Sequence, residues 1–314
     1  MRLAWTEVFQ RFVPPLTELL HKGSCGRIVV VGGSRFYTGA PYFSAAGAYR
    51  LGADLVSVLT TKEAAMAIRS FSPELMVCDS LGDDDAETQA FAQSVLQRAD
   101  GVVVGPGLGR TTSAQEHLRN VLPHVRNVLV LDADALSIMD ADALALVRAQ
   151  TCVLTPNVAE MSRLYSRFVP AEEQERLGAF EMNPDTSELL PFVDEISDAT
   201  RDGVPRCVQQ VTAVARHTNC VILRKGAVDF AVVNDRFAVF AAEGALRRCG
   251  GQGDLLSGAA ALYCSWAFKA TETEDSSSDC LFAALFAAST RIRQAAHVAF
   301  QKHGEFCGDT TAAA

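Results

Sequence analysis

Short apolar runs that do not alternate with polar residues recur along the chain and predict buried β-strands. Strands that are apolar on both sides are typical of a parallel sheet covered by helices on both faces. Helical stretches separate the runs, and this alternation indicates an α/β fold with a central, mostly parallel sheet. The predicted strands span residues 27–31, 55–59, 101–104, 128–131, 152–154 and 221–223.

The later part of the chain predicts an exception to the parallel pattern. Residues 229–233 and 236–240 are β-rich and flank Asn234-Asp235, a pair typical of a tight turn. They therefore predict an antiparallel hairpin added to the sheet. Two helices are expected after it, over residues 253–267 and from 280 to about 300.

One segment, residues 169–203, breaks the rhythm because its acidic side chains greatly outnumber its basic ones. We expect a partly mobile acidic surface excursion, and a partner-binding segment is the alternative. Residues 83–85 and 271–279 are expected to be exposed loops for the same reason. The length allows one or two domains, and we expect a single domain over residues 1–314.

The composition limits the kinds of molecule that the protein is expected to bind. A net charge of −9 disfavours nucleic acid and anionic membranes as partners. No apolar run approaches the roughly 20 residues that a membrane-spanning helix needs. Nine scattered cysteines without a CxxC motif are typical of reduced thiols.

The first residues, 1–22, lack the apolar core and cleavage site of a signal peptide. They include basic and aromatic side chains, but Glu7 and Glu18 weaken their likeness to a transit peptide. We therefore expect a packed N-terminal helix and a cytoplasmic protein, with a mitochondrial location as the alternative.

The strongest candidate chemistry lies in Arg247-Arg248-Cys249-Gly250-Gly251-Gln252-Gly253-Asp254, directly before an apolar helical run. Backbone amides of a glycine-rich turn at a helix N-terminus favour phosphate. A carboxylate repels phosphate, so Asp254 indicates acid/base work on a group that meets the phosphate. The helix N-terminus is expected to keep Asp254 ionised and weakly basic. The structural alternative is a glycine turn capped by Asp254, but three glycines exceed what a cap needs.

Other glycine and polar clusters follow predicted strands, where open parallel sheets bind their ligands. Residues 105–109, with the sequence Gly-Pro-Gly-Leu-Gly, are expected to form a tight turn that lets a ligand approach the backbone. Their spacing and Pro106 disfavour a dinucleotide fingerprint. Asp132 is expected to lie in the site, whereas Asp134 is either a site residue or a helix N-cap.

Two further clusters have both a structural and a functional interpretation. Asn157 and Glu160 fit a capping box, or they form an amide–carboxylate pair that holds substrate, water or Mg²⁺. Lys225 precedes Gly226 and either reaches phosphate or is an exposed turn lysine.

Together these motifs resemble the ribokinase-like enzymes, and among them most closely the ATP-dependent NAD(P)H-hydrate dehydratases, which repair hydrated nicotinamide cofactors. The resemblance covers roughly residues 22–267. The chain departs from the pattern in the acidic excursion and at Met161, where the family often has an aromatic residue. The matching stretches are 26–27, 31–33, 37–43, 52–55, 72–75, 105–110, 131–136, 154–160, 225–226 and 247–258.

The resemblance implies dehydration of (6S)-NADHX or NADPHX with ATP and Mg²⁺, and it makes Asp254 the catalytic residue that faces the substrate hydroxyl. No metal ligands are identified. The residues implied to contact the hydrated nucleotide are Gly107, Asn157, Val158, Ala159, Glu160, Met161, Ser162, Arg163 and Asp254. The residues implied to line the ATP site are Lys225, Gly226, Ala227, Val228, Asp229, Gly244, Ala245, Leu246, Arg247, Arg248, Cys249, Gly250, Gly251, Gln252 and Gly253.

Two other functions are compatible with the same motifs. A ribokinase-like kinase for a vitamin precursor or a sugar would share the glycine cradle and the aspartate. A non-enzymatic nucleotide-binding protein is the second alternative, although the intact cradle and Asp254 argue against it. A homo-oligomer is compatible with either function.

Overall fold

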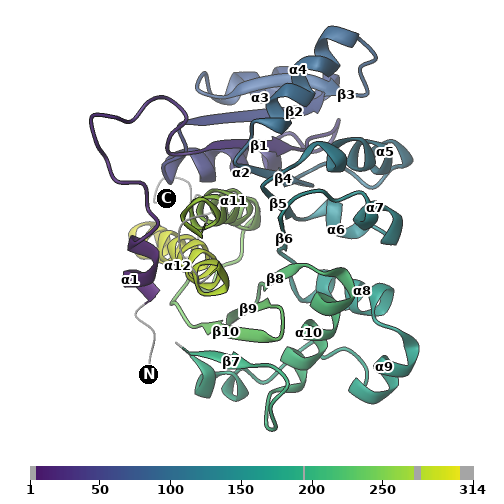
Figure 1. Ribbon diagram of the computed structural model, residues 1–314, viewed down its shortest axis with the longest axis vertical. Coiled ribbons are helices and arrows are strands. Elements are labelled where there is room, and N and C mark those ends of the chain that lie inside the picture. Colours follow the sequence, from purple (N-terminus) through teal and green to yellow (C-terminus); the bar gives the residue numbers. More distant parts are fainter. Residues whose placement is uncertain (1–4, 194, 272–276, 305–314) are drawn as a thin grey trace.

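The computed structural model describes residues 5–193, 195–271 and 277–304, and within them one twisted sheet runs through the molecule (Figure 1). Its ten strands are β1 (Arg27–Val31), β2 (Leu55–Thr61), β3 (Met76–Leu81), β4 (Gly101–Val104), β5 (Val128–Leu131), β6 (Thr151–Leu154), β7 (Ile196–Asp198), β8 (Val221–Arg224), β9 (Asp229–Val233) and β10 (Arg236–Phe240). They lie in the order β3-β2-β1-β4-β5-β6-β8-β9-β10-β7.

The pairing of the strands confirms the predicted topology. The seven strands from β3 to β8 in that order pair in parallel, and β9, β10 and β7 are antiparallel to their neighbours. The hairpin of β9 and β10 has the predicted bounds. Two strands of the structure, β3 and β7, were not predicted, and each lies at an edge of the sheet.

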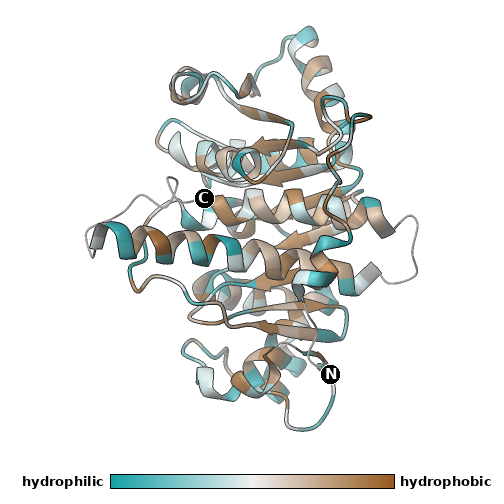
Figure 2. Ribbon diagram, turned by 90° about the vertical axis from the view of Figure 1, so that its left-hand side faces the viewer, coloured by the Kyte–Doolittle hydropathy of each residue, from teal (hydrophilic) through white to brown (hydrophobic). Residues whose placement is uncertain are grey.

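Helices cover both faces of the sheet, as predicted. The helices are α1 (Trp5–Gln10), α2 (Gly39–Arg50), α3 (Lys62–Phe71), α4 (Ala86–Gln97), α5 (Thr112–Val121), α6 (Asp134–Ile138), α7 (Ala141–Ala145), α8 (Val158–Phe168), α9 (Ala171–Leu177), α10 (Arg206–Thr218), α11 (Gln252–Thr271) and α12 (Ser277–His303). One face carries α1, α2, α3, α11 and α12, and the other carries α4 to α10. Figure 2 looks onto the first face, where apolar strands lie behind α11 and α12.

Two separate cores explain why the strands are apolar without alternation. In β1, Ile28 and Val30 belong to the core beneath α11 and α12, while Val29 and Val31 belong to the core on the opposite face. Successive side chains of a strand point to opposite faces, so both sets must be apolar when both faces are covered.

Small residues bring α11 unusually close to α2 and to the sheet. A Cβ atom placed on Gly258 would lie 1.9 Å from the backbone oxygen of Ser44, and one on Gly47 would lie 2.6 Å from that of Leu255. A Cβ on Gly101 of β4 would lie 2.7 Å from the backbone oxygen of Ala261. These contacts fix α11 across the middle of the sheet with its N-terminus at the carboxyl ends of the strands.

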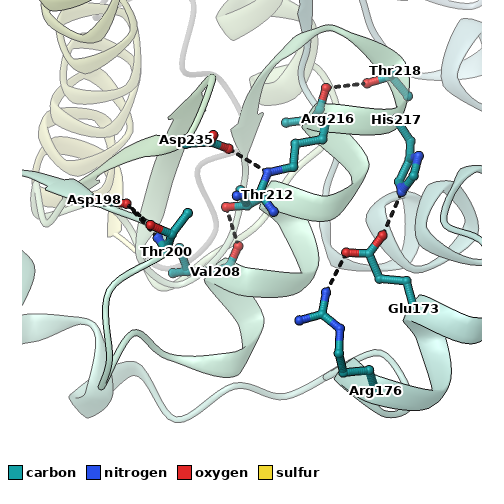
Figure 3. Close-up of polar contacts among 11 residues, drawn as sticks. Glu173, Arg176, Asp198, Thr200, Val208, Thr212, Arg216, His217, Thr218 and Asp235 are labelled. Atoms are coloured by element: carbon teal, nitrogen blue, oxygen red, sulfur yellow. Dashed lines mark hydrogen bonds and ion pairs between the residues drawn. The ribbon is translucent and has the colours of Figure 1, made fainter.

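The acidic segment exposes most of its acidic side chains, as expected for a surface excursion, and it also contains regular structure that the sequence did not predict. It contains α9, two short 3₁₀ helices (Thr186–Glu188 and Leu190–Phe192) and β7, which pairs with β10. Phe192 packs on Phe237 of β10, with 5.1 Å between ring centroids. Figure 3 shows Glu173 of α9 paired with His217 of α10 at 2.7 Å. Asp194 lies outside the described residues.

The predicted N-terminal helix and the two predicted loops agree with the structure only in part. The predicted N-terminal helix is reduced to the short α1, whose Trp5 packs against the rings of Phe240 and Phe286. The predicted loop at 83–85 is confirmed, with Asp85 capping α4. Most of the predicted loop at 271–279 lies outside the described residues. No helix in the described part of the chain has the length and apolar character to cross a membrane.

The close approach of α11 to α2 makes a specific stability prediction. Gly258→Ala is expected to destabilise the fold by about 2–3 kcal/mol, because the new methyl group meets backbone that cannot rotate away. This loss exceeds the roughly 1 kcal/mol that alanine gains over glycine within a helix. Urea unfolding measures the difference.

The control for this prediction is Gly39→Ala in α2. Its Cβ would meet only the ring of Phe43, at an ordinary 3.6 Å. A change within about 0.5 kcal/mol is expected there. Equal effects of the two substitutions would contradict the claim of close helix packing.

Candidate active site

The glycine-rich stretch forms the turn into α11 and places Asp254 inside its first turn. Gly251 has a φ of +92°, a conformation that favours glycine, and a Cβ on it would lie 2.9 Å from the ring of Phe43. The helix begins at Gln252, so Asp254 is its third residue and not the capping residue. The alternative of a turn capped by Asp254 is therefore wrong.

A buried ion pair joins the ends of two strands beside this turn. Lys225 follows β8, and its Nζ lies 2.8 Å from Oδ1 of Asp132, which follows β5. The same oxygen accepts a hydrogen bond of 2.8 Å from Oγ1 of Thr155. The Asp132 side chain is 1% exposed and that of Lys225 is 19% exposed. The alternative of an exposed turn lysine is thus wrong, and Asp132 is the partner of this lysine.

Electrostatics at the site differ from the expectation for a helix N-terminus. Burial, reinforced by the Asp132 carboxylate and opposed by the Lys225 ammonium, raises the pKa of Asp254 to about 7. Burial outweighs the helix dipole, so Asp254 is a stronger base than the sequence predicted. A carboxylate with a pKa near neutrality suits proton acceptance at neutral pH.

The lysine remains a cation in spite of its burial. Burial works to lower the pKa of Lys225, but the neighbouring carboxylates, Asp132 first, outweigh it and raise that pKa. Burial also raises the pKa of Glu160, partly offset by Lys225. The site therefore concentrates several carboxylates around one ammonium group.

The 105–109 turn packs against the loop that precedes α2. Gly33 donates its backbone N–H to the carbonyl of Pro106 at 2.9 Å. Gly107 has a φ of +64°, and a Cβ on it would lie 2.8 Å from Cβ of Tyr37. The prediction of a tight turn is confirmed, and Tyr37 is 58% exposed beside it.

Asp134 holds this turn from the start of α6. Its carboxylate accepts the backbone N–H of Gly109 at 2.9 Å and pairs with Arg110 at 2.8 Å. The N-cap position belongs to Ala133, so the N-cap interpretation of Asp134 is wrong. Its role in the structure is to fix the turn that carries Gly107.

The stretch 157–163 begins α8 with a complete capping box. Glu160 donates its backbone N–H to Oδ1 of Asn157 at 2.9 Å, and the Asn157 N–H bonds to Oε2 of Glu160 at 2.8 Å. The structural interpretation of this pair is confirmed. Within the same stretch Met161 is fully buried in the core, whereas Arg163 and Ala159 are exposed, with Val158 and Ser162 half-buried.

The turn from Lys225 to Asp229 is held by a residue that the sequence did not single out. Arg293 of α12 donates to both carboxylate oxygens of Asp229, at 2.7 and 3.0 Å, and to the backbone oxygens of Gly226 and Ala227. Asp229 also accepts the N–H of Gly226. The Asp229 carboxylate therefore stabilises the turn, which also contains Val228.

Both ends of the stretch 244–253 lie beside the turn from Lys225 to Asp229. A Cβ on Gly244 would lie 3.6 Å from the Arg293 side chain, and one on Gly253 would lie 3.5 Å from Nζ of Lys225. The structure thus brings together the two stretches implied to line the ATP site. Between them, Leu246 is 93% exposed, Arg247 and Arg248 are exposed, and Ala245 and Cys249 are half-buried.

A distant arginine such as Arg293 could not be found from the sequence, because only tertiary packing brings it to the turn. The sequence marks Arg293 only as a basic residue on the polar side of a long helix. Across the described residues, no group of three or more His, Cys, Asp and Glu side chains is arranged to hold a metal ion.

Comparison with known proteins identifies relatives over most of the chain. A family model described as NAD(P)H-hydrate dehydratase matches residues 28–313. The ATP-dependent (S)-NAD(P)H-hydrate dehydratase of Rattus norvegicus is 37% identical over 301 residues, which cover 95% of this chain and 79% of the relative. The protein of the same name from Schizosaccharomyces pombe is 32% identical, covering 94% of this chain and 85% of the relative.

Solved structures confirm the ribokinase-like fold. A ribokinase-like superfamily protein of Enterococcus faecalis superposes with a TM-score of 0.68 at 21% identity, covering 96% of this chain and 95% of that chain. The ADP/ATP-dependent NAD(P)H-hydrate dehydratase of Bacillus subtilis, co-crystallized with ATP/Mg²⁺, superposes with a TM-score of 0.65 at 18% identity, covering 99% and 93%.

The raised pKa of Asp254 makes a prediction about stability. The folded pKa of about 7 lies above the ordinary value of 3.8, so the fold loses stability as pH rises from about 4 through about 7. Asp254→Asn removes this loss. The variant's melting temperature, relative to that of the unsubstituted protein, should rise over that range and level off near pH 8.

Asp140→Asn is the matched control, because it makes the same change at the cap of α7. Its difference in melting temperature is expected to show no comparable rise over this pH range. A flat difference for Asp254→Asn would show that Asp254 keeps an ordinary pKa.

Proposed function

The chain belongs to the NAD(P)H-hydrate dehydratase family, and we propose from this premise that it uses ATP to dehydrate (6S)-NADHX or (6S)-NADPHX, releasing ADP and phosphate. The relatives that carry this activity in their names match nearly the whole chain. The observation that carries the proposal for the site is the Asp254 carboxylate directly behind a glycine-rich turn, with the Lys225 ammonium beside that turn.

The chemistry follows from a poor leaving group. The hydrated ring carries a hydroxyl on C6, and hydroxide leaves with difficulty. We propose that this oxygen attacks the γ-phosphorus of ATP while its proton passes to Asp254, so that ADP leaves. The N1 lone pair then expels phosphate from C6, and loss of a proton from C5 restores the dihydropyridine.

Each part of the site has a role in this scheme. The backbone amides of Gly250 to Gly253 would hold the transferring phosphoryl group, and the Lys225 ammonium beside them would offset its charge. Gly107 and the exposed residues of 157–163 would contact the hydrated nucleotide. The turn held by Arg293 and the stretch from Gly244 would contact ATP.

Magnesium fits this site as part of the nucleotide substrate. Mg²⁺ commonly keeps several waters and binds through substrate phosphates, so a protein cage is not required. The described residues offer no such cage. The ion would enter as Mg·ATP and neutralise phosphate charge near Lys225.

We propose a cytoplasmic location, with the mitochondrion as the alternative. Cys25, Cys78, Cys152, Cys207, Cys220, Cys249 and Cys264 are free thiols, which fits a reducing compartment. The excess of acidic residues favours small-molecule partners over nucleic acid.

The central experiment incubates the purified chain with (6S)-NADHX, ATP and Mg²⁺. The near-ultraviolet absorbance of NADH and the release of free phosphate should rise together, one for one. A stable phosphoester without NADH would identify a small-molecule kinase. Absence of ATP consumption with either hydrated cofactor would contradict the proposed dehydration.

Asp254→Asn is expected to keep the fold and to lower kcat by about 10²–10⁴-fold, because the general base is lost. Circular dichroism verifies the fold, and the coupled absorbance and phosphate assay measures turnover. Turnover close to that of the unsubstituted protein would remove Asp254 from the mechanism.

Gly251→Val is expected to raise the KM for ATP and to lower kcat, because the side chain strains the turn and collides with Phe43. Gly203→Val is the control. Gly203 also has a positive φ, of +81°, but its Cβ would meet open space far from the cradle along the chain. Gly203→Val therefore measures the effect of backbone strain alone, without damage to the cradle. Unchanged ATP kinetics in Gly251→Val would argue against the cradle.

A further inference from the structure

Asp132 is the most deeply buried carboxylate at the site, and the chemistry proposed above gives it no task. Its side chain is 1% exposed. Oδ1 accepts from Lys225 and Thr155, whereas Oδ2 is buried and has no hydrogen-bond partner among the described residues. A buried carboxylate with half of its hydrogen-bonding capacity unused is costly to the fold. Such a cost is typical of groups that serve function.

The ion pair determines where the lysine ammonium lies. Lys225 is anchored at its backbone by a hydrogen bond to the carbonyl of Pro156 and at Nζ by Asp132. Held in this way, Nζ lies 3.5 Å from the position of a Cβ on Gly253, directly before Asp254. Both partners follow parallel strands, β5 and β8, whose ends cannot easily move apart.

We propose that Asp132 is a positioning residue for phosphoryl transfer, because it fixes the Lys225 ammonium beside the glycine cradle and holds a second negative charge near Asp254. This inference rests on the function proposed above and adds a residue to its machinery. Asp132 acts through Lys225 and Asp254 and does not itself meet the substrate.

In this arrangement the Lys225 cation serves the phosphate, and the Asp254 carboxylate stays available as the base. Without Asp132, the charges of Glu160 and Asp254 would remain to attract the ammonium of Lys225. A pair between Lys225 and Asp254 would weaken Asp254 as a base and withdraw the cation from the phosphate. With Asp132 in place, the cation stays at the cradle and the base keeps its proton affinity.

Each charged group that faces Asp254 shifts the pKa of its carboxyl in a definite direction. Asp132 after β5, Asp134 of α6 and Glu160 of α8 all raise its pKa, and Lys225 after β8 lowers it. Asp132 has the largest effect among these charges. Removing the Asp132 charge and removing the Lys225 charge must therefore move the pKa of Asp254 in opposite directions.

The test compares Asp132→Asn and Lys225→Gln in the full-length protein. Asp132→Asn keeps the side-chain shape and the acceptor for Thr155. It should move the acidic limb of the kcat profile to lower pH by about one unit and lower kcat at neutral pH roughly tenfold. Lys225→Gln should lower kcat as well, but move the limb to higher pH. Limbs that stay in place, or that move in the same direction, would overturn the proposal.

A second readout does not depend on turnover. The Asp254 carboxyl resonance, assigned by its loss in Asp254→Asn, is titrated by ¹³C NMR in the same variants. Its pKa should fall in Asp132→Asn and rise in Lys225→Gln. Asp140→Asn, the same change at the cap of α7, should alter neither the resonance nor the rate profile.

The two readouts separate the possible failures. If the unsubstituted protein does not convert the hydrated cofactors but the NMR shifts appear, the proposed function fails and the positioning of charge by Asp132 stands. If turnover is present and the Asp254 titration does not respond to Asp132→Asn, the positioning role fails alone. If one variant does not fold, the other still predicts a shift of defined sign.

Discussion

The architecture of the site depends on the absence of side chains where α11 meets its neighbours. Gly258 and Gly47 allow the backbones of α11 and α2 to touch, and Gly101 allows α11 to touch β4. A helix held by backbone contact cannot shift or rotate without collision. Its first turn, with the glycine cradle and Asp254, is therefore fixed relative to the strand ends that carry Asp132 and Lys225.

On this rigid support the molecule holds an arrangement of charge that is unfavourable for stability. Asp132, Glu160 and Asp254 share a single buried ammonium, and burial raises the pKa of Asp254 by opposing its ionisation. Stability alone would favour an apolar cluster at this place. The fold tolerates the arrangement because two large cores, one on each face of the sheet, stabilise the strands from which it projects.

The sequence predicted the inner strands well because each is apolar on both sides. It missed β3 and β7, and these are the two edges of the sheet, where one-sided pairing and partial exposure allow mixed composition. From local spacing it predicted the glycine-rich turn and the helix that begins beside Asp254. It could not predict the role of Arg293 or the pKa of Asp254, because both arise from groups that only the tertiary fold brings together.

The acidic segment contains a three-residue strand, β7, which covers the outer edge of β10. An uncovered β10 would present a row of unpaired N–H and C=O groups to other molecules, and such edges recruit strands from neighbouring chains. A strand this short, flanked by carboxylates, offers little to add to and repels copies of itself. Shortening the segment would uncover this edge, and we expect the protein to lose solubility before it loses its chemistry.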